Sequence, residues 1–206
     1  MSESGTIHPD PAQWRGLRLA ATANLAAGAL VLVGGFLSGS QAVTADALDF
    51  LGLGSIAAVA LLALGRDQTS RARAVLIQAV VQGLLSFLVI IAAIYRLFGE
   101  RTPQPAMMAA FGLCALAANA VIAHLVLKDS GVSAGARAIW TRSRSDLLED
   151  GAIVAAALTV WLSGSAWADC LVAAVIAAPL LRSSWTTMLD SRGDLSGADR
   201  RRRRAV

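Results

Sequence analysis

The sequence has little charge. Only 16% of its 206 residues are Asp, Glu, Lys or Arg, whereas 56% are hydrophobic. Soluble domains carry about 25% charged residues, so this composition argues against a soluble domain and indicates a lipid environment.

Cysteine and histidine are also scarce, with two of each in the chain. Cys114 and Cys170 both fall in apolar stretches, which argues against a disulfide framework and against a Cys/His zinc motif. We interpret the cysteines as small packing residues, and His8 and His124 as solvated or packed side chains. No nucleophile has a histidine nearby in any apolar stretch, so the sequence predicts that the protein is not an enzyme.

Long apolar stretches, by contrast, are abundant. Each of six is close to the roughly 20 residues that cross a hydrocarbon core about 30 Å thick, and backbone groups in lipid must be satisfied within a helix. The sequence therefore predicts an all-α membrane protein, a six-transmembrane-helix bundle over residues 17–185, with an N-terminal tail at 1–16 and a basic C-terminal tail at 186–206. The predicted spans are 17–37, 43–64, 74–95, 106–127, 140–162 and 167–185, with Ser-Gly-Ser turns at 38–40 and 163–165 and a longer loop at 128–139.

Basic residues are distributed unevenly about these spans. Of the 18 lysines and arginines, all but Arg96 and Arg101 lie on the side of the membrane that holds the N-terminus. Because cytoplasmic loops carry the excess of basic residues, both termini are predicted to be cytoplasmic (N-in/C-in), in the inner (plasma) membrane of a bacterium. The arginine run at 200–204 suits anionic lipid headgroups. The predicted partner is therefore the lipid bilayer, and no nucleic acid is expected.

Acidic residues fall inside two of the spans. Between Asp150 and the turn at Ser163 a helix covers only about 18 Å, so the fifth span must extend back through Asp150 and Asp146 to cross the membrane. The same argument places Asp49, and with it Asp46, within the bilayer on the second span. Each buried acid costs about 2.5–3.5 kcal/mol on insertion scales. These acids must therefore be protonated or hold a cation.

Helical spacing groups these acids. Asp146 and Asp150 are one turn apart, as are Asp46 and Asp49, and the two spans run in opposite directions. Convergent carboxylates form a site for a divalent metal. Two alternatives stay open: that Asp146 is an interfacial first-turn acid, and that Asp46 lies in the first turn of its helix in the outer leaflet.

Three short motifs and one asparagine follow one another along the predicted spans. Segment 24–49 has a Ser-rich turn followed by Ala-Asp-Ala-Leu-Asp, segment 146–150 has the form Asp-x-x-x-Asp, and segment 167–169 is Trp-Ala-Asp. With Asn119 in the fourth span, these segments resemble the motifs of the second, fifth and sixth helices of the cation diffusion facilitator family of divalent-metal transporters. The resemblance covers residues 17–190.

The resemblance implies a tetrahedral transport site with Asp49, Asp146 and Asp150 as metal ligands. The fourth family ligand falls on Leu53, which cannot coordinate a metal. The candidates to complete the shell are a water, Glu149 or, as an auxiliary ligand, Asp46. Most family members also carry a cytoplasmic domain that binds metal and supports dimers. We expect this chain to be the membrane domain only, and a homodimer stays open.

The resemblance further implies efflux of a divalent transition-metal cation, zinc in the first place, by antiport with protons and without a permanently bound cofactor. Metal ions and protons would compete for the same carboxylates. Two alternatives stay open. The all-oxygen ligand set favours manganese or iron. Leu53 and the missing cytoplasmic domain favour a degenerate, non-transporting membrane scaffold or interaction protein.

Overall fold

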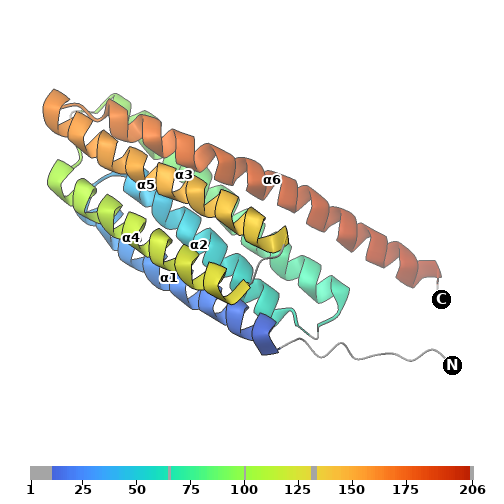
Figure 1. Cartoon of the computed structure of the whole chain (residues 1–206). Helices are drawn as coiled ribbons and strands as arrows, with labels where there is room; N and C mark the ends of the chain where they lie inside the picture. The colour runs from blue at the N-terminus through green and yellow to red at the C-terminus, as the bar shows by residue number, and fades with distance from the viewer. Residues whose placement is uncertain (1–10, 65, 100, 131–133, 205–206) are drawn as a thin grey trace.

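The computed structural model describes residues 11–64, 66–99, 101–130 and 134–204, and within these ranges the chain forms long helices and no strands. The helices lie side by side in one bundle, and α1 begins at the same end of the bundle at which α6 ends (Figure 1). In chain order they are α1 (Pro11–Ser38), α2 (Gln41–Leu62), α3 (Gln68–Leu97), α4 (Pro105–Ser130), α5 (Ala134–Ser163) and α6 (Trp167–Arg204).

Five of the described helices, all except α5, are long and apolar enough to cross a membrane. This confirms the prediction of an all-α, multi-pass membrane protein. The exception follows from composition, because the described part of α5 includes Arg144, Asp146, Glu149 and Asp150. At 30 residues α5 is nevertheless as long as α3, and it packs along α4. The N-in/C-in orientation stays a prediction.

The helices extend beyond the predicted spans. α1 begins at Pro11, inside the predicted tail 1–16, and α6 continues to Arg204, through most of the predicted tail 186–206. α4 and α5 likewise take up most of the predicted loop 128–139. Hydropathy identifies only the apolar part of a helix. Polar residues such as Arg, Gln and Asp can extend the same helix beyond the apolar part, so the helices are longer than the predicted spans. Residues 1–10, with His8, and residues 131–133 lie outside the described part of the chain.

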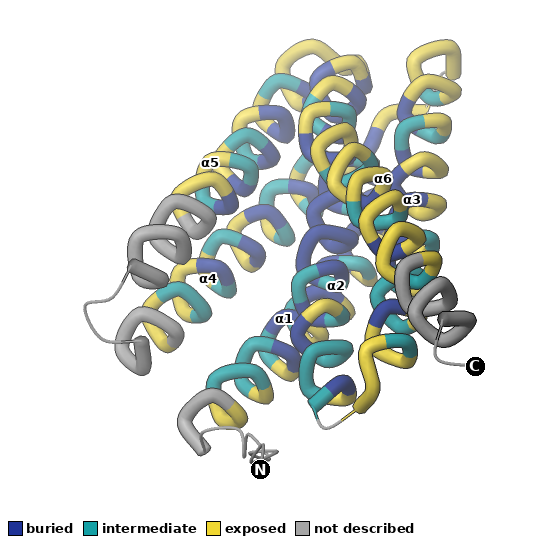
Figure 2. Tube along the Cα trace, turned by 90° about the vertical axis from the view of Figure 1, so that its right-hand side faces the viewer, coloured by how far each residue is buried: buried dark blue, intermediate teal, exposed yellow. Residues whose placement is uncertain are grey.

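The helices pack as hairpins joined into a ring. α1 packs most extensively on α2, and α4 on α5; α1 also packs on α4, and α6 lies against both α5 and α2. α3 lies outside this ring, against α6 and α2. Figure 2 shows buried positions turned toward the centre and exposed positions turned outward. The outward side chains of α3, such as Leu84, Leu88 and Ile91, are large and apolar and are thus suited to contact lipid.

Two Ser-Gly-Ser turns close hairpins at one end of the bundle, as predicted. Gly39 has a φ of 64°, a left-handed conformation that glycine adopts without a steric penalty, and the Oγ of Ser38 accepts from the backbone N–H of Ser40 (3.2 Å). The turn at 163–165 repeats this arrangement, with the same φ at its glycine and the same distance between its two serines. The turns set α1 antiparallel to α2 and α5 antiparallel to α6.

Asp169, in the first turn of α6, caps the N-terminus of α2. Its carboxylate accepts from the hydroxyl of Ser40 and from the backbone N–H groups of Gln41 (2.9 Å) and Ala42 (3.0 Å). The Oγ of Ser40 in turn accepts from the N–H of Val43 (3.1 Å). The first N–H groups of a helix have no partner within it and attract negative charge. The fully buried Asp169 therefore has a structural explanation that the sequence did not reveal.

Replacing Asp169 with alanine is expected to lower the free energy of unfolding by about 2–3 kcal/mol, because three donors at the start of α2, two of them buried, lose their acceptor. Denaturant unfolding of the purified protein in detergent micelles measures this. Asp67→Ala is the matched control, because Asp67 caps α3 by accepting from the N–H of Ser70 (3.1 Å) on the exposed surface. We expect a smaller loss there, and equal losses for the two variants would contradict the role of burial.

Candidate metal centre

The candidate acids lie at comparable depth on two antiparallel helices. The start of α2 and the end of α5 are at the same end of the bundle, because Asp169 at the start of α6 holds the first turn of α2. From that end, Asp49 lies eight residues into α2, and Asp150 lies thirteen residues before the last residue of α5. These separations correspond to about 12 and 20 Å along the helices. Both distances are well within the thickness of a hydrocarbon core, about 30 Å, so both residues are expected to lie inside the membrane.

All four predicted acids are turned into the bundle. Asp46, Asp49 and Asp146 are at most 7% exposed, and Asp150 is fully buried. Asp46 is near enough to interact electrostatically with the other three and with Glu149. The structure thus brings the predicted residues of both helices into one buried region.

One amide from a third helix supports this region. Asn119 on α4 donates from Nδ2 to Oδ2 of Asp150 (2.9 Å), so the fourth-span residue noted in the sequence touches a candidate ligand. Oδ1 of Asp150 and Oδ2 of Asp46 are buried and have no hydrogen-bond partner among the described residues. A buried carboxylate oxygen without a partner is costly, and a proton or a bound cation is what can satisfy it.

The acids do not form a closed coordination shell. Within the described ranges, no three His, Cys, Asp or Glu side chains are gathered closely enough to hold a metal ion. The reason lies in the packing: α2 and α5 are on opposite sides of the ring and touch only sparingly. Asp46 of α2 and Asp150 of α5 do approach within side-chain hydrogen-bonding distance, but among the described residues no third acid joins them closely enough to complete a shell.

The remaining residues singled out in the sequence lie less centrally. Leu53 is half-buried and lines a cavity beside Asp49. Glu149 is half-buried and accepts from the hydroxyl of Ser145 (3.3 Å). The two cysteines and His124 are packing or surface residues. Cys170 packs in the core, while Cys114 and His124 are exposed.

Sequence reasoning missed Gln82. This side chain on α3 is buried, and it lines the cavity that also contains Asp49 and Leu53. The available signal was a polar residue within the apolar stretch 74–95, which is costly in lipid unless it has a partner. Nothing in the sequence indicated that this face of α3 would turn toward α2.

Buried acids in the membrane-spanning helices of a multi-pass bundle are typical of proteins that move ions or protons. The comparisons with known proteins agree with this class. The family model of the cation efflux transmembrane domain matches residues 17–196, and the chain belongs to this family.

Two curated relatives are similar to the chain. They are the zinc transporters ZitB of Escherichia coli (strain K12) and of Shigella flexneri, each 32% identical over 183 residues, which is 80% of this chain. The chain spans 56% of the length of either relative.

Asp150→Asn is expected to stabilise the metal-free protein by about 1–3 kcal/mol at pH 8. A neutral amide can still accept from Asn119, and unlike a buried carboxylate it needs no proton to stay neutral, so at pH 8 its burial carries neither a charge nor the cost of protonation. Thermal unfolding in detergent with a chelator measures this, and Asp190→Asn, at an exposed position of α6, is the control. A clear loss of stability in Asp150→Asn would mean that the carboxylate is already compensated in the folded protein.

Proposed function

We propose that this protein exports a divalent transition-metal cation, zinc in the first place, from the cytoplasm of a bacterium in exchange for protons. The observation that carries this proposal is the burial of four acids, Asp46 and Asp49 on α2 and Asp146 and Asp150 on α5, inside the helix bundle. Membership of the cation efflux family supports the same class of substrate.

In the proposed cycle, Asp49, Asp146 and Asp150 bind the cation directly. Carboxylates in lipid hold protons when no cation is present, and a divalent cation displaces those protons because it binds only the ionised form. Cation arrival on one side thus releases protons, and reprotonation from the other side releases the cation. Asp46, one turn from Asp49, is proposed as an auxiliary ligand or proton carrier.

Binding would also change the structure of the bundle. The described acids of α2 and α5 form no closed shell, so a cation bound by Asp49, Asp146 and Asp150 together must draw these side chains closer to one another. Asn119, which already holds one oxygen of Asp150, would keep that carboxylate oriented during the approach. Such a rearrangement is the two-state element that alternating access requires.

Zinc is proposed because the two relatives are named as zinc transporters. The candidate ligands are carboxylates, and an all-oxygen site suits manganese or ferrous iron as well. Manganese and iron are therefore the alternative substrates, and a flux assay across these three metals distinguishes them.

The second candidate function is that of a non-transporting membrane scaffold. Leu53, at the position of a family ligand, favours it. The buried acids argue against it, because a scaffold gains nothing from carboxylates that cost about 2.5–3.5 kcal/mol each to insert. Metal binding by the purified protein separates the two functions.

Asp150→Ala is expected to abolish metal uptake into everted membrane vesicles, because it removes the most deeply buried candidate ligand. Uptake of Zn²⁺ driven by an imposed pH gradient measures the effect, and a protonophore should stop uptake by the unmodified protein. Asp190→Ala, which removes an exposed acid from α6, should transport normally. Unchanged uptake by Asp150→Ala would refute the assigned site, and uptake that persists without a pH gradient would refute proton coupling.

A further inference from the structure

We infer that Oε1 of Gln82 supplies the metal ligand that Leu53 cannot provide. This inference rests on the proposed function, since it names a further ligand of the same site. Three observations carry it: the orientation of the Gln82 amide, its contact with the turn of α2 that follows Asp49, and a cavity that Asp49, Leu53 and Gln82 line together.

A backbone hydrogen bond orients the amide. Gln82 is 9% exposed, and its Nε2 donates to the carbonyl oxygen of Leu48 (2.9 Å). A carbonyl oxygen only accepts hydrogen bonds, so the amide nitrogen and not the amide oxygen must face Leu48. The contact therefore leaves Oε1 as the acceptor that Gln82 can offer to a cation.

The amide lies against the turn of α2 that separates Asp49 from Leu53. A Cβ atom added to Gly52 would lie 3.0 Å from Nε2 and 3.1 Å from Oε1 of Gln82, so the absence of a side chain at Gly52 lets the amide approach α2 this closely. Gly52 is three residues after Asp49 and directly precedes Leu53. Because residues three and four apart share a helix face, Gln82 is placed within one turn of both positions.

The three side chains border the same space. A cavity of about 260 Å³ between α2, α3 and α6 is lined by Asp49, Leu53 and Gln82 and also by Ser183, Ser184 and Thr187. Pro179 borders it too and has no N–H, so α6 lacks one backbone hydrogen bond beside this space. A cavity with hydroxyl, amide and carboxylate groups at this depth suits a hydrated cation rather than lipid.

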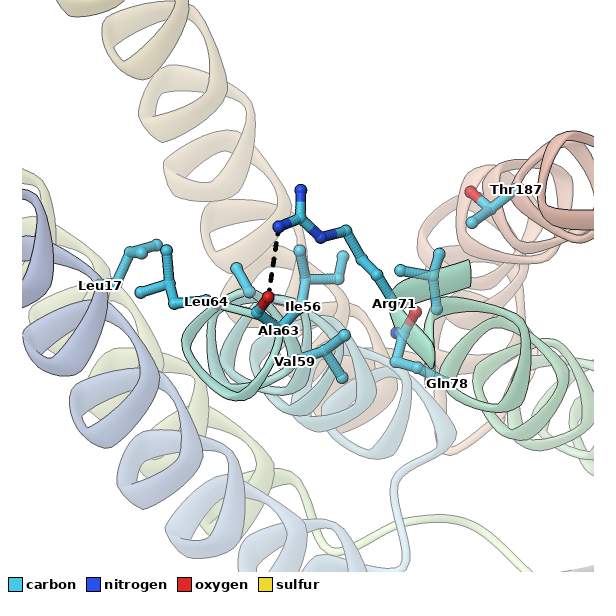
Figure 3. A pocket seen from close by; sticks show the side chains of 10 residues that line it. Leu17, Ile56, Val59, Ala63, Leu64, Arg71, Gln78 and Thr187 are labelled. Carbon is cyan, nitrogen blue, oxygen red and sulfur yellow. Dashed lines mark hydrogen bonds between the residues drawn. The ribbon is translucent and has the colours of Figure 1, made fainter. Parts of the chain in front are cut away.

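This cavity adjoins a larger one of about 510 Å³, because Ile56, Gln78 and Thr187 line both. Figure 3 shows the larger cavity, with Gln78 and Thr187 on its walls and Arg71 bonded to the carbonyl oxygen of Ala63 (3.2 Å). Ala63 directly follows α2, and Arg71 lies in the first turn of α3. The space thus leads from that end of the bundle toward Asp49, and Gln82 lies where a cation would arrive.

The chemistry of an amide oxygen fits this role. It is a hard, neutral ligand of the kind that accompanies carboxylates around divalent cations. Of the proposed ligands only Asp49 lines the cavity with Gln82; once a cation has drawn in Asp146 and Asp150, the amide oxygen would complete a shell of four residues without a fourth charge to desolvate. An amide also takes up no proton, so proton exchange would be left to the carboxylates.

Metal titration of the purified full chain in detergent tests the inference, with Zn²⁺ and Mn²⁺ as probes and calorimetry as the readout. Gln82→Leu is expected to bind at least about tenfold more weakly. Gln78→Leu is the matched control: it removes an amide one turn away on α3 that lines the same cavity and donates to the hydroxyl of Ser55 (3.2 Å). Its affinity should stay within about twofold of the unmodified chain.

A second variant separates a ligand from a packing residue. Leu53→Asp in the Gln82→Leu background is expected to restore Zn²⁺ binding, because it places a carboxylate at the family position. If Gln82 only held α3 against α2, a carboxylate at position 53 would not restore Zn²⁺ binding. Gln82→His should raise the preference for Zn²⁺ over Mn²⁺, since imidazole is the softer ligand.

The outcomes distinguish this inference from the function on which it rests. If Asp150→Ala abolishes binding while Gln82→Leu binds like the unmodified chain, Gln82 is not a ligand and the carboxylate site stands. If Gln82→Leu loses affinity and Leu53→Asp fails to restore it, the role of Gln82 is structural and the inference is overturned. If the unmodified chain binds neither metal, the proposed function fails and the inference fails with it.

Discussion

A carboxylate in the hydrocarbon core needs a compensating partner, and much of this structure depends on how that need is met. Asp169 and Asp150 are both fully buried, yet their surroundings differ. Asp169 accepts from a hydroxyl and two backbone N–H groups at the start of α2, so its charge is balanced by the helix terminus. Asp150 accepts from Asn119 on one oxygen, while the other has no partner among the described residues. The first acid holds helices together, and the second is left able to bind a proton or a cation.

Asp169 also positions the acids of α2. By holding the first turn of α2 against the start of α6, Asp169 sets the register of α2 in the bundle, and that register determines how far Asp46 and Asp49 lie from this end. α5 approaches from the opposite direction, through its hairpin with α6. α2 and α5 touch only sparingly, so their acids share a buried region in which Asp46 and Asp150 supply the contact between the two helices. This arrangement suits binding that is reversible and coupled to a conformational change.

Much of the fold could be predicted from the sequence, because apolar stretches of about 20 residues have few alternatives to a membrane helix. The Ser-Gly-Ser turns were equally accessible, since glycine in a short connection indicates a tight hairpin. Helix ends were predicted less well: α6 continues to Arg204 because the polar residues after the apolar part are still compatible with a helix. The placement of Asp150 inside a helix also followed from the sequence, as the apolar part of α5 is too short to span the membrane alone.

The amino-acid sequence by itself determined which stretches enter the lipid and which acids enter with them, because hydrophobicity and helical rise are local properties of the chain. Only the tertiary structure decided the partners of those acids. Asp169 meets Ser40 across 129 residues of sequence, and Gln82 meets Leu48 across 34. Such contacts depend on which helix faces are turned toward each other, and that is decided by the packing of the whole bundle, in which many side chains contribute small energies at once.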